Sequence, residues 1–117
     1  MKNMATEISV FDSDEFEKMV AKRDLRISTA LVETILKNLN SRKRHLHALS
    51  IFVENEETIY DVTVDRLDFI ETLENNLSIY EENELYEGCA EIVKAIKFLK
   101  TKGLVDGIKE SKKKLKK

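Results

Sequence analysis

The sequence predicts a small, mostly helical α+β protein in the order helix, helix, β-hairpin, helix, helix, with the antiparallel hairpin at its centre. Apolar residues recur at helical spacing before residue 41 and after residue 65. Between residues 47 and 64 they recur at every second position, which is typical of strands. The length of 117 residues and a hydrophobic fraction of 42% suffice for one core, so we expect a single domain.

The first two predicted helices each begin at a polar residue that can accept hydrogen bonds from free amides. Asp12 or Ser13 opens the first helix, and Glu15 stands where a capping box places it. Residues 24–27 are predicted to connect the two helices, and Ser28 to cap the second. The apolar set of the second helix then follows helical spacing: Ile27, Leu31, Val32, Ile35, Leu36 and Leu39.

Two alternating runs around the polar residues 54–57 predict the hairpin. The larger alternating set defines one face: Leu49, Ile51, Val53, Tyr60, Val62 and Val64. His47 precedes Leu49 in the same alternation, at the polar end of the strand. Phe52 and Ile59 point the other way. Because four helices can cover one face of a hairpin, we expect the larger set to be buried. Phe52 and Ile59 should then stay near the surface, where they can bind a partner or a second copy of the chain. The alternative is that the first helix folds back over these two residues and makes their face a second packing surface.

The second half of the chain predicts two further helices joined by an acidic turn at residues 81–84. Asp65 is expected to cap the third helix, with Leu67, Ile70, Leu73, Leu77 and Tyr80 facing inward. The fourth helix carries Tyr86, Cys89, Ala90, Ile92, Val93, Ile96 and Leu99, and Gly103 is placed to end it. We therefore expect one domain over residues 1–108 and a flexible lysine-rich tail over residues 109–117.

One stretch of these two helices matches a known motif. It comprises Leu73-Glu74-Asn75-Asn76-Leu77, Tyr80-Glu81-Glu82-Asn83-Glu84, Tyr86-Glu87-Gly88-Cys89-Ala90-Glu91-Ile92, Ile96 and Leu99. This pattern resembles the UVR motif, the helical hairpin that links the excision-repair proteins UvrB and UvrC. It departs at Val93-Lys94, where that family usually has an Arg-Asp pair. The resemblance covers residues 73–99 only, and implies a helical hairpin that contacts another protein rather than a catalytic activity.

Charge is unevenly distributed along the chain. The net charge is −2, but residues 109–117 hold six Lys and one Glu, which makes them +5 and leaves −7 on residues 1–108. Attraction of the acidic body to nucleic acid would therefore have to come from local patches. Cys89 is the only cysteine, and no apolar run is long enough to cross a bilayer. Both observations favour a cytoplasmic location with no membrane contact.

No residue pattern indicates catalysis or a cofactor. His45 and His47 share one side of a strand, but a metal site needs further ligands that the sequence does not supply nearby. Cys89 belongs to an apolar helix face, which is the ordinary setting of a structural thiol. The glycines at 103 and 107 lack the Lys-Ser/Thr pair of a phosphate-binding loop. We predict no metal, no cofactor, no catalytic residue and hence no enzyme.

Two charged features point to macromolecular partners. The leading hypothesis is a non-enzymatic protein-interaction module, meaning a small adaptor, inhibitor or regulatory subunit like the accessory proteins of bacteria and phages, with a homodimer also open. Its candidate binding residues are Phe52, Ile59, Glu81, Glu82 and Glu84. The alternative is a nucleic-acid-associated regulator whose basic clusters at residues 42–45 and 112–117 contact phosphates. Its candidate residues are Arg42, Lys43, Arg44, Lys112, Lys113 and Lys114.

Overall fold

The structure, a computed structural model, describes the backbone of residues 6–116 and the side chains of residues 6–102. The elements follow in the order β1 (Thr6–Val10), α1 (Ser13–Ala21), α2 (Leu25–Lys37), β2 (His45–Val53), η1 (Glu54–Glu56), β3 (Thr58–Asp65), η2 (Arg66–Asp68), α3 (Phe69–Glu82) and α4 (Tyr86–Lys116). The predicted α+β class is confirmed. Within the described residues, no helix is long and apolar enough to cross a membrane.

The sheet has one strand more than the sequence analysis predicted. Its order is β1-β2-β3, with β1 parallel to β2 and β2 antiparallel to β3. The additional strand, β1, places Ile8 beside Ile51 and Val10 beside Val53, and all four side chains are buried. The hairpin that the sequence predicts is therefore the outer part of a mixed three-stranded sheet, and β1 removes one of its two open edges.

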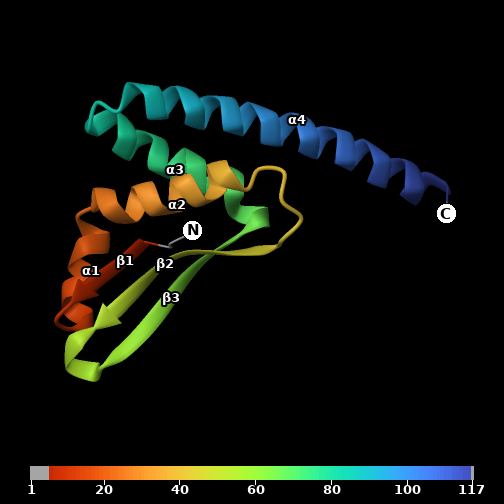
Figure 1. Cartoon of the computed structure of the whole chain (residues 1–117). Coiled ribbons are helices and arrows are strands. Elements are labelled where there is room, and N and C mark those ends of the chain that lie inside the picture. The colour runs from red at the N-terminus through yellow and green to blue at the C-terminus, as the bar shows by residue number, and fades with distance from the viewer. Residues whose placement is uncertain (1–5, 117) are drawn as a thin grey trace.

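The helices lie on one side of this sheet in successive layers (Figure 1). α2 packs between the sheet and α3, and α3 packs against α4, while α1 lies beside the end of β1. The largest fully buried side chains come from every layer: Phe69, Ile35, Leu49, Ile51, Leu73, Ile92, Val10, Val32 and Val53. One continuous core thus runs from the sheet through α2 to the α3–α4 hairpin. No helix of residues 6–116 covers the other face of the sheet.

The second helix begins earlier than predicted, which changes the role of Ser28. Asp24 is the N-cap of α2, and its carboxylate accepts a hydrogen bond of 2.8 Å from the amide of Arg26. Ser28 lies inside α2 and is buried, and its hydroxyl donates to Oδ1 of Asn76 on α3 at 2.7 Å. Asn76 also donates to the carbonyl of Thr72. This buried pair satisfies its own polar groups and fixes how α2 lies on α3.

The start of the third helix also differs from the prediction. Asp65 caps the 3-10 turn η2 and not α3. Leu67, which the sequence predicts to face inward, is therefore 75% exposed, and Phe69 is buried instead. Arg66 then ties this corner to the end of α2. Its guanidinium donates to the carbonyls of Asn38 and Lys43 and lies 4.8 Å from the centroid of the Phe69 ring. A positive group at the C-terminal end of a helix satisfies carbonyls that have no partner within the helix.

α4 does not end at Gly103 as the sequence predicts, but runs to Lys116. A glycine costs only about 1 kcal/mol inside a helix, which is too little to end one that begins with a long packed segment. The predicted flexibility of residues 109–117 concerns side chains outside those that the structure describes.

Candidate interaction surface

The uncovered face of the sheet, called the open face below, is the main surface that the fold leaves free. Strand alternation and the register of the three strands direct ten side chains away from the helices: Glu7, Ser9, His45, His47, Ser50, Phe52, Ile59, Asp61, Thr63 and Asp65. A bulge between His47 and Leu49 decides the orientation of one of them. The extra residue, Ala48, is buried, so His47 points to the open face and not with Leu49 as its spacing predicts.

Phe52 and Ile59 form an apolar pair on this face. They are direct partners in the β2–β3 register, and Ser9 of β1 lies on the other side of Phe52. Ile59 is 57% exposed and Phe52 is partly buried. The expectation that both side chains lie opposite the core agrees with this arrangement. Directly opposed aromatic and β-branched side chains also stabilise the hairpin, and the strand register fixes which residues form the pair.

Beside this pair lies a hydrogen-bonded cluster of His47, Ser50 and Asp61. The Ser50 hydroxyl donates to Oδ1 of Asp61 at 3.0 Å, and Nε2 of His47 lies 2.9 Å from the same hydroxyl oxygen. Nε2 also lies 3.4 Å from Oδ1 of Asp61. A catalytic triad needs the histidine between the hydroxyl and the carboxylate, with a different ring nitrogen on each. Here one nitrogen meets both groups, so the cluster does not activate Ser50.

The basic residues of the alternative hypothesis lie at one end of the sheet. Arg42, Lys43 and Arg44 are all exposed, and Nε of Arg44 lies 3.3 Å from Oδ2 of Asp65. Nδ1 of His45 lies 3.8 Å from the same oxygen. The pKa of Asp65 is lowered, first by the hydrogen bond from the amide of Leu67 and then by the Arg44 guanidinium. Lys112, Lys113 and Lys114 belong to the part of α4 whose side chains the structure does not describe.

The lowered pKa of Asp65 predicts a measurable acid dependence of stability. Because the folded-state pKa lies below the unfolded value, the unfolded chain binds more protons between the two. The stabilisation is therefore present above the unfolded pKa of about 4 and is lost as the pH falls through the folded pKa.

Asp65→Asn keeps the capping oxygen but not the charge. Urea unfolding should show that wild type has a larger free energy of unfolding than Asp65→Asn above about pH 4. This difference should disappear as the pH is lowered through the folded-state pKa. The same comparison in an Arg44→Ala background should show a smaller pH effect, and an advantage independent of pH would contradict this account.

The acidic residues of the leading hypothesis lie away from the open face. Glu81 and Glu82 end α3, Glu84 is in the turn to α4, and all three are exposed. Glu82 pairs with Arg23 at 3.4 Å, and Arg23 also donates to Ser78, so this turn is tied to the α1–α2 corner. In Figure 1 the α3–α4 turn lies on the far side of the helices from the β2–β3 turn. The structure therefore does not combine these glutamates with Phe52 and Ile59 in one surface.

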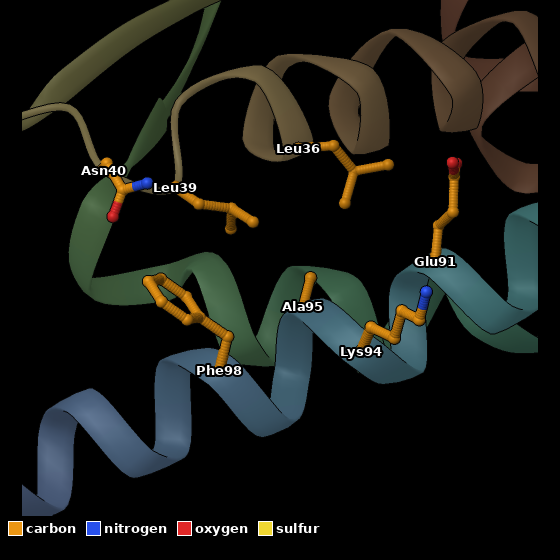
Figure 2. Close-up of a pocket in the computed structure, with 7 residues that line it drawn as sticks. All are labelled: Leu36, Leu39, Asn40, Glu91, Lys94, Ala95 and Phe98. Atoms are coloured by element: carbon orange, nitrogen blue, oxygen red, sulfur yellow. The ribbon is translucent and has the colours of Figure 1, made fainter.

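A groove between α2 and α4 is a feature that the sequence analysis did not predict (Figure 2). Its volume is about 490 Å³, and it is lined by Leu36, Leu39, Asn40, Glu91, Lys94, Ala95 and Phe98. Figure 2 shows Leu36 and Phe98 pointing into the gap, with Glu91 and Lys94 at one end. Phe98 is 41% exposed. The groove forms because α4 crosses the end of α2 at the small residue Ala95. The spacing of apolar residues within each helix does not predict where the two helices cross.

A smaller hollow of about 330 Å³ lies between α2 and the sheet, beside Thr6, Lys37, Lys43 and Leu46. It is mainly polar. Cys89 is partly buried on α4, in the helical layers, whereas both histidines lie on the open face. Among the described side chains, no three His, Cys, Asp or Glu residues gather closely enough to hold a metal ion.

Comparison with known proteins adds nothing to this geometry, since no protein-family model, curated protein or solved structure matches the chain.

Proposed function

We propose that this protein is a non-enzymatic protein-interaction module, and that the open face binds the partner. The observation that carries the proposal is the Phe52–Ile59 pair. The pair lies on a sheet face that no described helix covers, and Ile59 is 57% exposed. Polar groups that can orient a partner surround it, namely the His47–Ser50–Asp61 cluster. An apolar centre with a polar rim is the usual composition of a protein-binding surface.

Two further features support a partner that is a protein. The α3–α4 hairpin is the region that resembles the UVR motif, whose members contact proteins. Its acidic turn offers Glu81 and Glu84, which form no ion pair with any of the described side chains. This turn is a second and separate contact point for a basic partner surface. The open face remains the main site in our proposal, because apolar burial contributes more to affinity than exposed charges do.

The proposal predicts that Phe52→Asp and Ile59→Asp each abolish capture of the partner without unfolding the protein. Ile59 is exposed and Phe52 only partly buried, so circular dichroism should stay unchanged for Ile59→Asp and nearly so for Phe52→Asp. The measurement is affinity capture from lysate of the native host, treated with nuclease. Leu67→Asp is the matched control, since Leu67 is 75% exposed and follows the end of β3.

Three outcomes are informative. Capture that resists nuclease, is lost in both open-face variants and is kept in Leu67→Asp supports the proposal. Capture that survives both open-face changes contradicts it and moves attention to Glu81 and Glu84. Capture that disappears on nuclease treatment supports the alternative function, nucleic-acid association.

The alternative has its own supporting observation. The exposed loop with Arg42 and Lys43 and the far end of α4 both extend toward the same end of the molecule (Figure 1). Phosphate contacts of this kind are strongly salt-dependent and carry no sequence preference. Arg42→Ala with Lys43→Ala should therefore weaken binding to duplex DNA or to RNA of any sequence, and leave capture of a protein unchanged.

A further inference from the structure

The outer edge of β3 is the longer of the two open edges of the sheet. β3 has eight residues and is the last strand in the sheet, so one side of its backbone pairs with no strand of the described chain. The opposite edge is formed by β1, with five residues. Open edges in monomeric proteins are commonly blocked by proline, lysine or a bulge. β3 contains no proline or lysine, and the one irregularity in its pairing lies on β2.

The helix-facing side of β3 is also incompletely covered. Tyr60 belongs to the core-facing set by its register, yet it is 49% exposed, and Val62 is only partly buried. Tyr60 is less buried than the sequence predicts because the described helices cover β1 and β2 and do not reach over the outer half of β3. The Tyr60 hydroxyl donates to Glu56 at 2.8 Å, which holds the ring along the strand.

The sequence of β3 suits antiparallel pairing with itself. In a two-fold pair, residues of the same face must lie opposite each other. A register centred on Asp61 would oppose two Asp61 carboxylates, and one centred on Thr63 would oppose Asp61 and Asp65. The register centred on Val62 avoids both. It places Tyr60 opposite Val64 of the second copy, and so joins the apolar rows of both chains.

Charge at the two ends of the strand favours the same arrangement. The β2–β3 turn carries three carboxylates and no cation, since Glu54, Glu56 and Glu57 are all exposed and Asn55 is neutral. The other end of β3 carries four cations against two carboxylates: Arg42, Lys43, Arg44 and Arg66 against Asp65 and Asp68. Antiparallel pairing brings the acidic end of each chain to the basic end of the other. Parallel pairing would oppose like charges at both ends.

We propose that two copies of this chain pair through the β3 edges, antiparallel and centred on Val62, to form a continuous six-stranded sheet. The open faces of both copies then lie on the same side, with two Phe52–Ile59 pairs exposed. The dimer does not depend on the partner proposed for the open face. Phe52 lies on β2, one strand away from the new junction, so Phe52→Asp should abolish partner capture and leave the dimer intact.

A cysteine placed on the two-fold axis tests the register directly. In a Cys89→Ala background, Val62→Cys should form a disulfide-linked dimer on mild oxidation, because opposed Cα atoms of an antiparallel pair are about 4.5–5.5 Å apart. Tyr60→Cys is the matched control on the same face. In this register its two copies are about 14 Å apart, since each residue advances about 3.4 Å along a strand, and they should not link. Equal linking at both positions would overturn the register, and no linking at Val62→Cys would overturn the pairing.

Sedimentation equilibrium of the unmodified chain is the second test. Wild type should show twice the monomer mass of 13.6 kDa, with dissociation favoured by raising the salt concentration. Val62→Lys and Val62→Glu should each be monomeric, since the substitution opposes two like charges at the axis. An equimolar mixture of the two variants should recover the dimer. A wild type that stays monomeric at every concentration overturns the proposal, as does a mixture that remains monomeric while both variants keep wild-type circular dichroism.

Discussion

Replacing Ile92 with alanine should lower the free energy of unfolding by about 2–5 kcal/mol. Ile92 has no exposed surface and lies on the inner side of α4, in the same core as Leu73 of α3 and Ile35 of α2. Removing three carbon atoms there loses their transfer free energy and leaves a cavity. The buried Ser28–Asn76 hydrogen bond fixes α2 on α3, so these two helices can close the cavity only in part.

Val93→Ala is the matched control for this prediction. Val93 follows Ile92 on the same helix but is 40% exposed, so its truncation should change the free energy of unfolding by only about 0.5 kcal/mol. Urea unfolding of both variants gives the comparison, provided that the slope against denaturant is the same as in wild type. Similar losses in the two variants would show that the inner side of α4 is not packed as described. With a typical total stability of about 5–15 kcal/mol, the Ile92→Ala loss is a large fraction of the whole.

Local signals predicted the parts of this fold whose causes are local. The side chain of Asp12 accepts a hydrogen bond from the amide of Glu15, and the Glu15 side chain accepts one from the amide of Phe11, as the capping pattern indicates. The alternation of residues 49–53 likewise gave the correct buried face of β2. β1 was missed although it has the same signal on a shorter scale, since Ile8 and Val10 alternate with polar neighbours. Its pairing partner lies about 40 residues away in sequence, and parallel pairing of that kind leaves no turn to detect.

The errors arise where a distant contact decides the outcome. Serine is a common N-cap residue, but the hydroxyl of Ser28 instead donates to Asn76 of another helix inside the core. His47 fits the alternation of the buried face until the bulge at Ala48 turns it to the open face. Tyr60 has the correct orientation but not the predicted burial, because coverage depends on how far the helices extend over the sheet. The Phe52–Ile59 pair was predictable because the alternation and register of two neighbouring strands are enough to place it. The α2–α4 groove was not, because it depends on how two helices distant in sequence cross.

The second large effect concerns the only close approach of a glycine among the described side chains. Gly88→Ala should lower stability by about 1–3 kcal/mol, although alanine is the better helix former by about 1 kcal/mol. A Cβ at position 88 would lie 2.5 Å from Cε2 and 2.6 Å from Cδ2 of Tyr80. Carbon atoms in contact are normally about 3.5–4.0 Å apart. Tyr80 is only 6% exposed, so its ring has little open space into which to turn.

A double-mutant cycle separates this steric effect from helix propensity. In a Tyr80→Ala background the obstructing ring is gone, and Gly88→Ala should there become stabilising by up to about 1 kcal/mol. Ala90→Gly, at an exposed position on the same turn of α4, measures the propensity cost alone. The expected result is a change of sign for Gly88→Ala between the two backgrounds, read from urea midpoints. If alanine at position 88 stabilises the unaltered chain, α3 and α4 do not approach each other as closely as the contact of Gly88 with Tyr80 requires.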